Sequence, residues 1–254
     1  MQTLSVALGL RDRLSKTMSN MFSDMIQKFT NKQAMFRGQR RTYVPEDGFA
    51  DDPSKRGYTH VESTMEEQLK WFKEHSREYF KNTLSIEKTN STGIVVELQV
   101  GDEVWGKYST LELLRLKSIL DGQMKHFISE MPTRKESQIW TRTSDPNYAG
   151  RNVFETELLQ GYSKTTLKRT EIVSDPHIKD SPTRPPVTQQ IETQVNIGKY
   201  TTQDFSGEMS IREKADILVK MEKVYQGVVR ALEKANGAKV EESDLGDRFL
   251  DFLF

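Results

Sequence analysis

The chain has 254 residues, with 37 basic and 37 acidic side chains and no cysteine. This length can bury a sizeable hydrophobic core. The absence of cysteine excludes disulfides, thiolate nucleophiles and thiolate metal sites. Because the formal net charge is zero, there is no electrostatic reason to expect duplex DNA or an anionic membrane as a partner.

The sequence carries no signal for a membrane span or for export. No apolar run approaches the ~20 residues that cross a bilayer. Residues 1–10 are mildly apolar but lack the basic flank of a secretory signal. We therefore expect a cytoplasmic protein without membrane partners.

The first predicted element is a long amphipathic helix over residues 3–32, in which apolar residues recur every three to four positions. Residues 36–63 have few periodic apolar residues, so they are predicted to form a loop or a mobile arm. Ser63 and Glu66 make a capping-box pattern, which predicts a helix over residues 64–82.

A small antiparallel meander is predicted next, from short segments rich in β-forming residues with turn residues between them. Its strands are expected at residues 84–88, 94–100 and 104–108. Ser109 and Glu112 then form a second capping box, which begins another amphipathic helix. Pro132 is expected to end that helix.

The second half of the chain contains a further set of predicted strands. They are expected at residues 137–143, 152–158, 165–173, 188–195 and 199–205, with a turn at 196–198. A proline-rich segment over 175–186 cannot be a helix or a central strand. Ser210 and Glu213 cap a long helix that ends at Asn236, and the tail over 241–254 is expected to dock through its phenylalanines.

These elements predict an α+β protein, with antiparallel sheets and about five helices. The longest helices are the amphipathic ones at the N- and C-terminal ends. We treat residues 1–254 as a single domain and leave open a sub-boundary near residue 133. Such a boundary would separate a helix-rich half with the small meander (1–132) from a strand-rich half with the C-terminal helices (133–254).

Motifs for catalysis, metals and cofactors are absent from the sequence. The chain has four histidines, none paired with another at helical spacing, and it lacks a Gly-x-Ser-x-Gly elbow and a phosphate loop. We therefore predict no metal, no cofactor and no catalytic residue. An enzyme that acts on nucleotides or nucleic acid stays open as an alternative.

Cations interleaved with aromatic residues point to an anion or nucleotide site, since arginine forks suit phosphates and an aromatic plane suits a base. Trp140 and Arg142 are two positions apart on a predicted strand and therefore share a face. The candidate ligand-binding residues are Trp140, Arg142, Tyr148, Arg151, Lys164, Lys168, Arg169, His177, Arg184, Arg40 and Arg41. The alternative is that these side chains are solvated surface groups that protect strand edges.

Six short stretches follow one another after residue 138: Ile139-Trp140-Thr141-Arg142, Lys164-Thr165-Thr166-Leu167-Lys168-Arg169, Arg184-Pro185-Pro186, Ile197-Gly198-Lys199-Tyr200, Phe205-Ser206-Gly207 and Ala235-Asn236. In this order they resemble a family of uncharacterised bacterial and phage proteins of unknown function. Where that family tends to carry His-Pro-Ala-Gln, this chain has Arg184-Pro185-Pro186-Val187. No role of that histidine or glutamine is therefore transferred. The resemblance implies a similar fold and a bacterial or phage origin, and it brings no established activity.

We interpret the sequence as that of a non-enzymatic protein that sequesters a phosphate-bearing small molecule. The expected ligand is a nucleotide-derived immune signal, which a homo-oligomer would hold in the cytoplasm of a bacterial host as a phage anti-defence sponge. The alternative is a structural or assembly protein that acts through protein–protein contacts of its amphipathic helices. Nucleic acid is not expected as a partner, because the charge is balanced.

Overall fold

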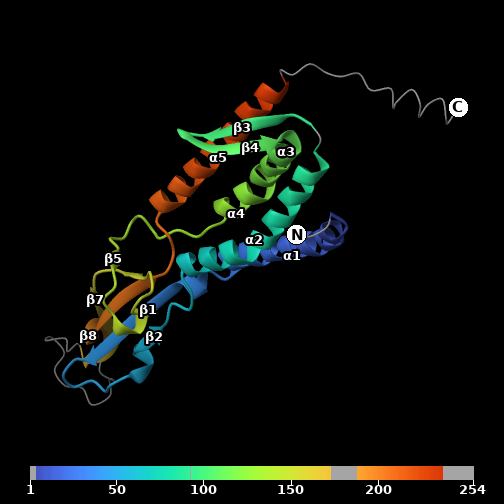
Figure 1. Ribbon diagram of the computed structural model, residues 1–254. Coiled ribbons are helices and arrows are strands. Elements are labelled where there is room, and N and C mark those ends of the chain that lie inside the picture. The colour runs from blue at the N-terminus through green and yellow to red at the C-terminus, as the bar shows by residue number, and fades with distance from the viewer. Residues whose placement is uncertain (1–3, 92, 173–187, 237–254) are drawn as a thin grey trace, which may run out of the picture. The chain divides into compact units, whose positions relative to one another are not determined.

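A computed structural model describes residues 4–91, 93–172 and 188–236 (Figure 1). The chain forms two compact units, and each unit combines segments that are far apart in the sequence. The helical unit comprises residues 1–33, 65–134 and 209–254, and the sheet unit comprises residues 34–64 and 135–208. The units are therefore not two successive halves of the chain, although residue 133 lies next to one of the points where the chain passes between them.

The helical unit contains the long helices and one small hairpin. Its helices are α1 (Leu4–Asn31), α2 (Met65–Asn90), α3 (Thr110–Ile119), α4 (Lys125–Ser129) and α5 (Ile211–Asn236), and a π-helical segment at Leu120–Met124 joins α3 to α4. The hairpin consists of the antiparallel strands β3 (Val95–Val100) and β4 (Glu103–Ser109). The predicted α+β class is confirmed, with long helices near both ends of the described chain.

Two clusters of buried side chains form the core of the helical unit. The first is aromatic and surrounds Phe127, whose ring centroid lies 4.5, 5.4 and 5.6 Å from those of Phe72, Phe29 and Phe22. The second joins β3 and α3 to α5, and its buried members are Leu98, Leu113, Val228, Ala231 and Leu232. The first cluster joins three helices and the second packs the hairpin against α5, so the apolar helix stripes are core-facing, as their spacing indicates.

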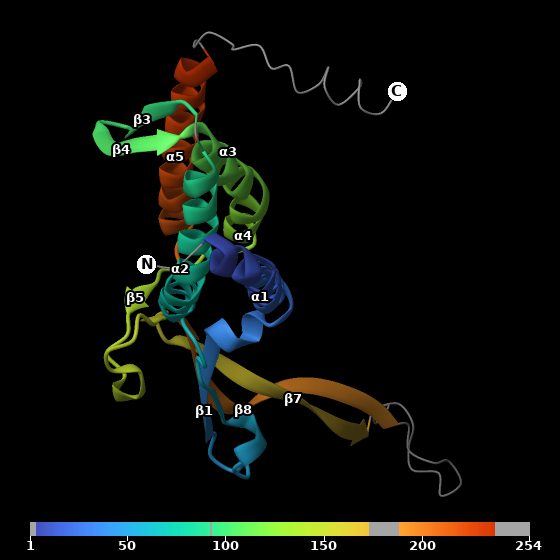
Figure 2. The same cartoon turned by 45° about the vertical axis from the view of Figure 1, so that its right-hand side comes forward.

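The sheet unit is a six-stranded antiparallel sheet. Its strands are β1 (Arg37–Pro45), β2 (Gly57–Thr59), β5 (Thr141–Arg142), β6 (Phe154–Glu155), β7 (Leu159–Ile172) and β8 (Thr188–Ser206). The strand order is β2-β1-β8-β6-β5, and β7 also pairs with β8. β8 is thus the central strand: it pairs with β1 over residues 198–206 and with β7 over 188–202. Over residues 188–197 of β8, β7 and β8 pair only with each other and form a two-stranded ribbon (Figure 2).

Local signals predict where the long helices begin and where the last one ends. The predicted helix over 3–32 is α1, and the predicted end of the last helix at Asn236 is confirmed. Both later capping boxes are present: the backbone N–H groups of Ser109 and Ser210 donate to the carboxylates of Glu112 and Glu213, at 2.8 and 2.6 Å. Within the described residues, no helix combines the length and the apolar character that crossing a membrane requires.

The prediction of a loop over residues 36–63 is wrong. Residues 37–45 form β1, which pairs with β8 over nine positions, and residues 57–59 form β2. Both faces of β1 carry polar side chains, so the strand has no alternation of apolar and polar residues. Backbone hydrogen bonds from β8 stabilise it instead, and these depend on a partner more than 150 residues away.

Three further strand predictions are corrected. Residues 84–88 belong to α2, because Tyr79, Thr83 and Ile86 continue its buried face at helical spacing. The segments 137–143 and 152–158 contain only the two-residue strands β5 and β6. The predicted regions 175–186 and 241–254 lie outside the described residues.

The predicted turn at 196–198 lies inside β8. Its glycine, Gly198, is needed because a side chain there would clash with a neighbouring residue, and not because the backbone turns. A Cβ atom at Gly198 would lie 2.3 Å from the ring atoms of Tyr43. The Tyr43 hydroxyl in turn donates to the carbonyl oxygen of Ile197 at 3.0 Å. Gly198 therefore allows the aromatic side chain of β1 to cross over β8, and the strand continues through it.

A candidate ligand cavity on the sheet unit

The two faces of the sheet carry different groups of side chains, because successive residues of a strand point to opposite faces. On β1 and β8, Arg40 pairs in register with Gln203, while Gln39 pairs with Asp204. Arg40 and Gln203 therefore share one face, and Gln39 and Asp204 share the other. The first face is covered by the loop that joins β5 to β6, and the second face holds a cavity.

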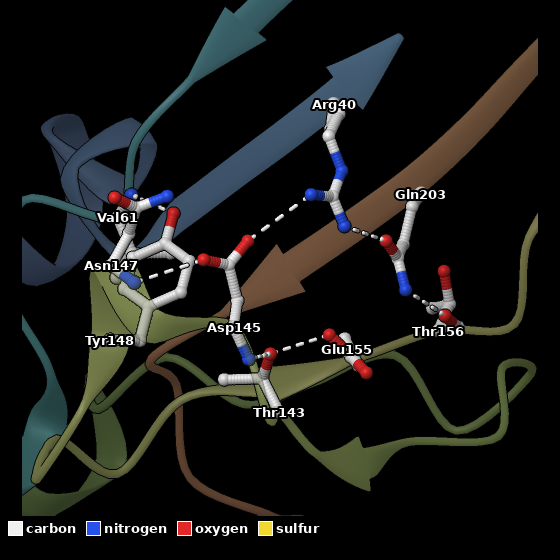
Figure 3. A network of polar contacts seen from close by, with 9 residues as sticks. All are labelled: Arg40, Val61, Thr143, Asp145, Asn147, Tyr148, Glu155, Thr156 and Gln203. Carbon is white, nitrogen blue, oxygen red and sulfur yellow. Dashed lines mark hydrogen bonds and ion pairs between the residues drawn. The ribbon is translucent and has the colours of Figure 1, made fainter. Parts of the chain in front are cut away.

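A polar network centred on Arg40 ties the covered face together (Figure 3). The Arg40 guanidinium donates to the Asp145 carboxylate at 3.3 Å and to the Gln203 side-chain carbonyl at 2.6 Å, and it lies 5.4 Å from the Phe205 ring centroid. Asp145 also accepts from the backbone N–H of Asn147 at 2.9 Å, which caps the short 3-10 turn that follows. Arg40 thus joins β1 and β8 to the covering loop.

Tyr148 and Arg151 attach the same loop to the segment that follows β2. The Tyr148 hydroxyl accepts from the backbone N–H of Val61 at 3.1 Å, and its ring is buried with Val61, Val153 and Phe205. The Arg151 guanidinium donates to the carbonyl oxygens of Val61 and Glu62, each at 2.9 Å. These two predicted ligand residues therefore make structural contacts on the covered face.

The protonation of Tyr58, on the same face of the sheet, is strongly shifted. Burial raises the pKa of the Tyr58 phenol from 10.0 to about 12, and a hydrogen bond with Tyr148 and the charges of Tyr148 and Asp145 add to the shift. The residue as a whole is 37% exposed, and its hydroxyl interacts with the side chains of Tyr148 and Asn147. The neutral phenol is therefore the favoured form in the folded protein.

This shift predicts a specific loss of stability in alkali. Because the folded-state pKa of Tyr58 is raised, its contribution is fully present below pH 10 and is lost as the pH rises from 10 to about 12. We expect Tyr58→Phe to make the free energy of unfolding fall less steeply over this range. Urea denaturation at a series of pH values measures the effect. Parallel curves for the variant and the wild type above pH 10 would contradict the assignment.

The opposite face of the sheet holds a cavity of about 470 Å³. Its floor is formed by β1 and β8, and one wall is formed by residues 135–140, which precede β5. The polar and aromatic residues of its lining are Arg37, Gln39, Thr59, Lys135, Gln138, Trp140, Asp204, Phe205, Ser206 and Glu208. A cavity of this volume is in the range that binds small molecules.

The Asp204 carboxylate is held in place by two amides. Its Oδ1 accepts from the Gln39 Nε2 at 2.8 Å, and its Oδ2 accepts from the Gln138 Nε2 at 3.2 Å. Among the residues that the structure describes, no cation contacts this carboxylate, and no three His, Asp or Glu side chains gather as a metal site would require. Asp204 is therefore an oriented acceptor in the cavity floor.

The aromatic and cationic groups of the lining come from the wall and from β1. The Trp140 indole N–H donates to the carbonyl oxygen of Lys135 at 3.0 Å, which restricts the orientation of the ring. The Lys135 ammonium makes no hydrogen bond or ion pair with the described part of the chain. Arg37 donates from Nε to the Glu208 carboxylate at 2.7 Å, and Glu208 is buried. The cavity therefore offers an exposed lysine, an arginine held by Glu208 and an aromatic plane.

The structure does not gather the predicted ligand residues into one site. Trp140 lines the cavity, whereas Arg40, Tyr148 and Arg151 make structural contacts on the covered face. The other described candidates are exposed: Arg41 lies 4.6 Å from the Tyr200 ring centroid, Arg142 is on β5, and Lys164, Lys168 and Arg169 are on the ribbon. Lys168 and Arg169 pair there with Glu192 and Glu171. His177 and Arg184 lie outside the described residues.

Sequence reasoning did not select most of the cavity residues. Gln39 and Asp204 come together only through the register of β1 and β8, and β1 lies in the segment that was predicted to be a loop. Gln138 reaches the same carboxylate from a segment without regular structure. The one usable signal was Arg37, which stands beside Arg40 and Arg41 in the densest basic cluster of the sequence.

The fold and the cavity define an α+β protein that carries a ligand-sized cavity on an antiparallel sheet. The chain belongs to a family of unknown function, DUF7873, whose profile matches residues 1–254. The predicted resemblance to an uncharacterised family is thus confirmed in this coarse form, and over the whole chain. A comparison with curated proteins and with solved structures found no match.

Proposed function

We propose that the sheet unit binds a phosphate-bearing small molecule with an aromatic base and holds it without converting it. The observation that carries this proposal is the position of Trp140 in the same cavity as Lys135 and Arg37. An indole presents a flat face on which a base can stack, and stacking on an aromatic side chain contributes about 1–3 kcal/mol. Sequestration of a nucleotide-derived signal is the biological role that such binding would serve.

The cations of the cavity support the phosphate part of this proposal. Lys135 has a flexible stem and a compact ammonium, which can reach phosphate oxygens as a point charge. Arg37 is held by Glu208 through its Nε atom, so its guanidinium has a defined position at the cavity. A ligand phosphate near Lys135 would give this cation the charge-assisted partner that the described protein residues do not supply.

A thermal-shift screen of the pure protein against mono-, di- and cyclic nucleotides tests the proposal. A ligand that binds only the folded state stabilises it by about 2.7 kcal/mol at a hundredfold excess over Kd. We expect a clear rise in Tm, with the ligand recovered intact after denaturation. Recovery of a converted product would instead favour an enzyme that acts on nucleotides.

Trp140→Ala is expected to weaken nucleotide binding by about 10- to 100-fold, because the stacking surface is lost. Trp105→Ala is the matched control, since Trp105 is a half-exposed tryptophan on β4 and does not line the cavity. Isothermal titration calorimetry measures both variants against the best ligand of the screen. Equal affinity of the two variants would remove Trp140 from the site.

A second candidate function is assembly through protein–protein contacts, and exposed apolar side chains favour it. Around the hairpin and the start of α3, six large apolar side chains are more than a third exposed: Ile94, Val95, Val104, Trp105, Leu111 and Leu114. Apolar surface of this kind is typical of association sites when it is contiguous. Light scattering after size exclusion tests this candidate, because a monomer at all concentrations would count against self-association.

A further inference from the structure

We infer that the Asp204 carboxylate makes the cavity selective for guanine over adenine. This inference rests on the proposed function, because it specifies which base the nucleotide carries. It depends on three properties of Asp204: the orientation of its two oxygens, the absence of a neighbouring cation in the described chain, and its position in the same cavity as Trp140.

The first property is that the two amides fix the plane of the carboxylate. Gln39 approaches one oxygen from β1, and Gln138 approaches the other oxygen from the cavity wall. An ionised carboxylate has about four acceptor positions on its two oxygens. The amides occupy one position on each oxygen, so each oxygen keeps a further position for a ligand donor.

The second property is that this acceptor capacity is not met by the protein. Asp204 is partly buried, and its side-chain contacts with the described residues are the two neutral amides. A carboxylate that is partly removed from water favours additional N–H donors. A ligand that offers two parallel donors would therefore bind with an orientation that matches both oxygens.

Guanine provides such a pair, because its N1–H and N2–H groups lie side by side on one edge of the ring. Adenine has an amino group beside N1, which is an acceptor, so one carboxylate oxygen would face a lone pair. The same carboxylate therefore attracts guanine and repels adenine. With the base edge at Asp204, the ring can stack on Trp140 and the phosphate can meet Lys135.

Calorimetric titration of the full-length protein with GMP, IMP and AMP tests the inference. We expect GMP to bind at least about tenfold more tightly than AMP, since only guanine offers a donor to each carboxylate oxygen. IMP keeps N1–H but lacks the N2 amino group, so its affinity should lie between those of GMP and AMP. This comparison uses the wild-type protein and needs no variant.

Asp204→Asn then assigns the selectivity to this side chain. The variant keeps the size of the side chain but replaces one acceptor oxygen with a donor. It should lower the affinity for GMP by about 10-fold or more and leave the affinity for AMP within about threefold. Glu192→Gln is the matched control, because Glu192 is a carboxylate on the ribbon, paired with Lys168 and outside the cavity lining.

The possible results distinguish a failure of this inference from a failure of the proposed function. If none of the three nucleotides binds but another nucleotide of the thermal-shift screen does, the inference fails and the proposed function stands. If no nucleotide of the screen binds, both fail. If all three bind equally, or if AMP binds best, the cavity binds nucleotides but the inference about Asp204 is wrong. If the wild type prefers GMP and the Asp204→Asn variant keeps both its thermal stability and that preference, a group other than Asp204 discriminates between the bases and the inference is wrong.

Discussion

Phe127→Ala is expected to lower the free energy of unfolding of the helical unit by about 3–5 kcal/mol, the usual cost of removing a buried phenylalanine. Phe127 is only 1% exposed, and its ring contacts those of Phe22, Phe29 and Phe72, which come from α1 and α2. The substitution leaves a cavity where three helices meet, and the neighbouring rings lose their aromatic contacts as well.

Chemical denaturation followed by circular dichroism measures this loss. Phe49→Ala is the matched control, because Phe49 is 37% exposed in the segment between β1 and β2, and its truncation should change stability by no more than about 0.5 kcal/mol. A similar effect of the two substitutions would show that the aromatic cluster is not the core of the unit.

Gly227→Ala is the second change with a large expected effect. We expect it to lower the free energy of unfolding, although helix propensity alone would favour alanine. Gly227 lies within α5, where alanine is normally favoured over glycine by about 1 kcal/mol. A Cβ atom here would lie only 2.4 Å from the carbonyl oxygen of Gln99 on β3 and 3.3 Å from Val100. Because a backbone oxygen cannot move without shifting the hairpin, we expect a net loss of about 1–3 kcal/mol.

Gly9→Ala is the control that isolates the steric cause. Gly9 lies within α1, and a Cβ atom added there would have no atom within 4 Å. The same substitution should therefore raise the free energy of unfolding, by up to about 1 kcal/mol. Thermal melts of the two variants should shift in opposite directions, and stabilisation by Gly227→Ala would contradict the close packing of α5 on β3.

The helices of this protein follow from short-range patterns. The stripe of α1, the capping serines at 109 and 210, and the end of α5 at Asn236 are all encoded within a few residues of where they act. Helical hydrogen bonds connect residues four apart, so the information needed to predict them is local. The hairpin of β3 and β4 was predicted for the same reason, since a short turn joins its strands.

The sheet required information that is not local. β1 was interpreted as a loop because its side chains are polar on both faces, and its stability as a strand comes from backbone pairing with β8. The glycine at 198 resembled a turn residue, and only the ring of Tyr43 above it shows why the strand continues. Pairing between distant strands is a property of the folded chain, so neither feature could be predicted from neighbouring residues.

The candidate site shows the same division. By itself, the sequence determined the α+β class and the starts of the long helices, and it selected Trp140 as a candidate, because these depend on residue type and local spacing. Only the tertiary structure decided which cations share a cavity with it. The register of β1 on β8 turns Arg40 toward the covered face and places Gln39 beside Asp204 on the other, since side chains on a strand alternate between faces.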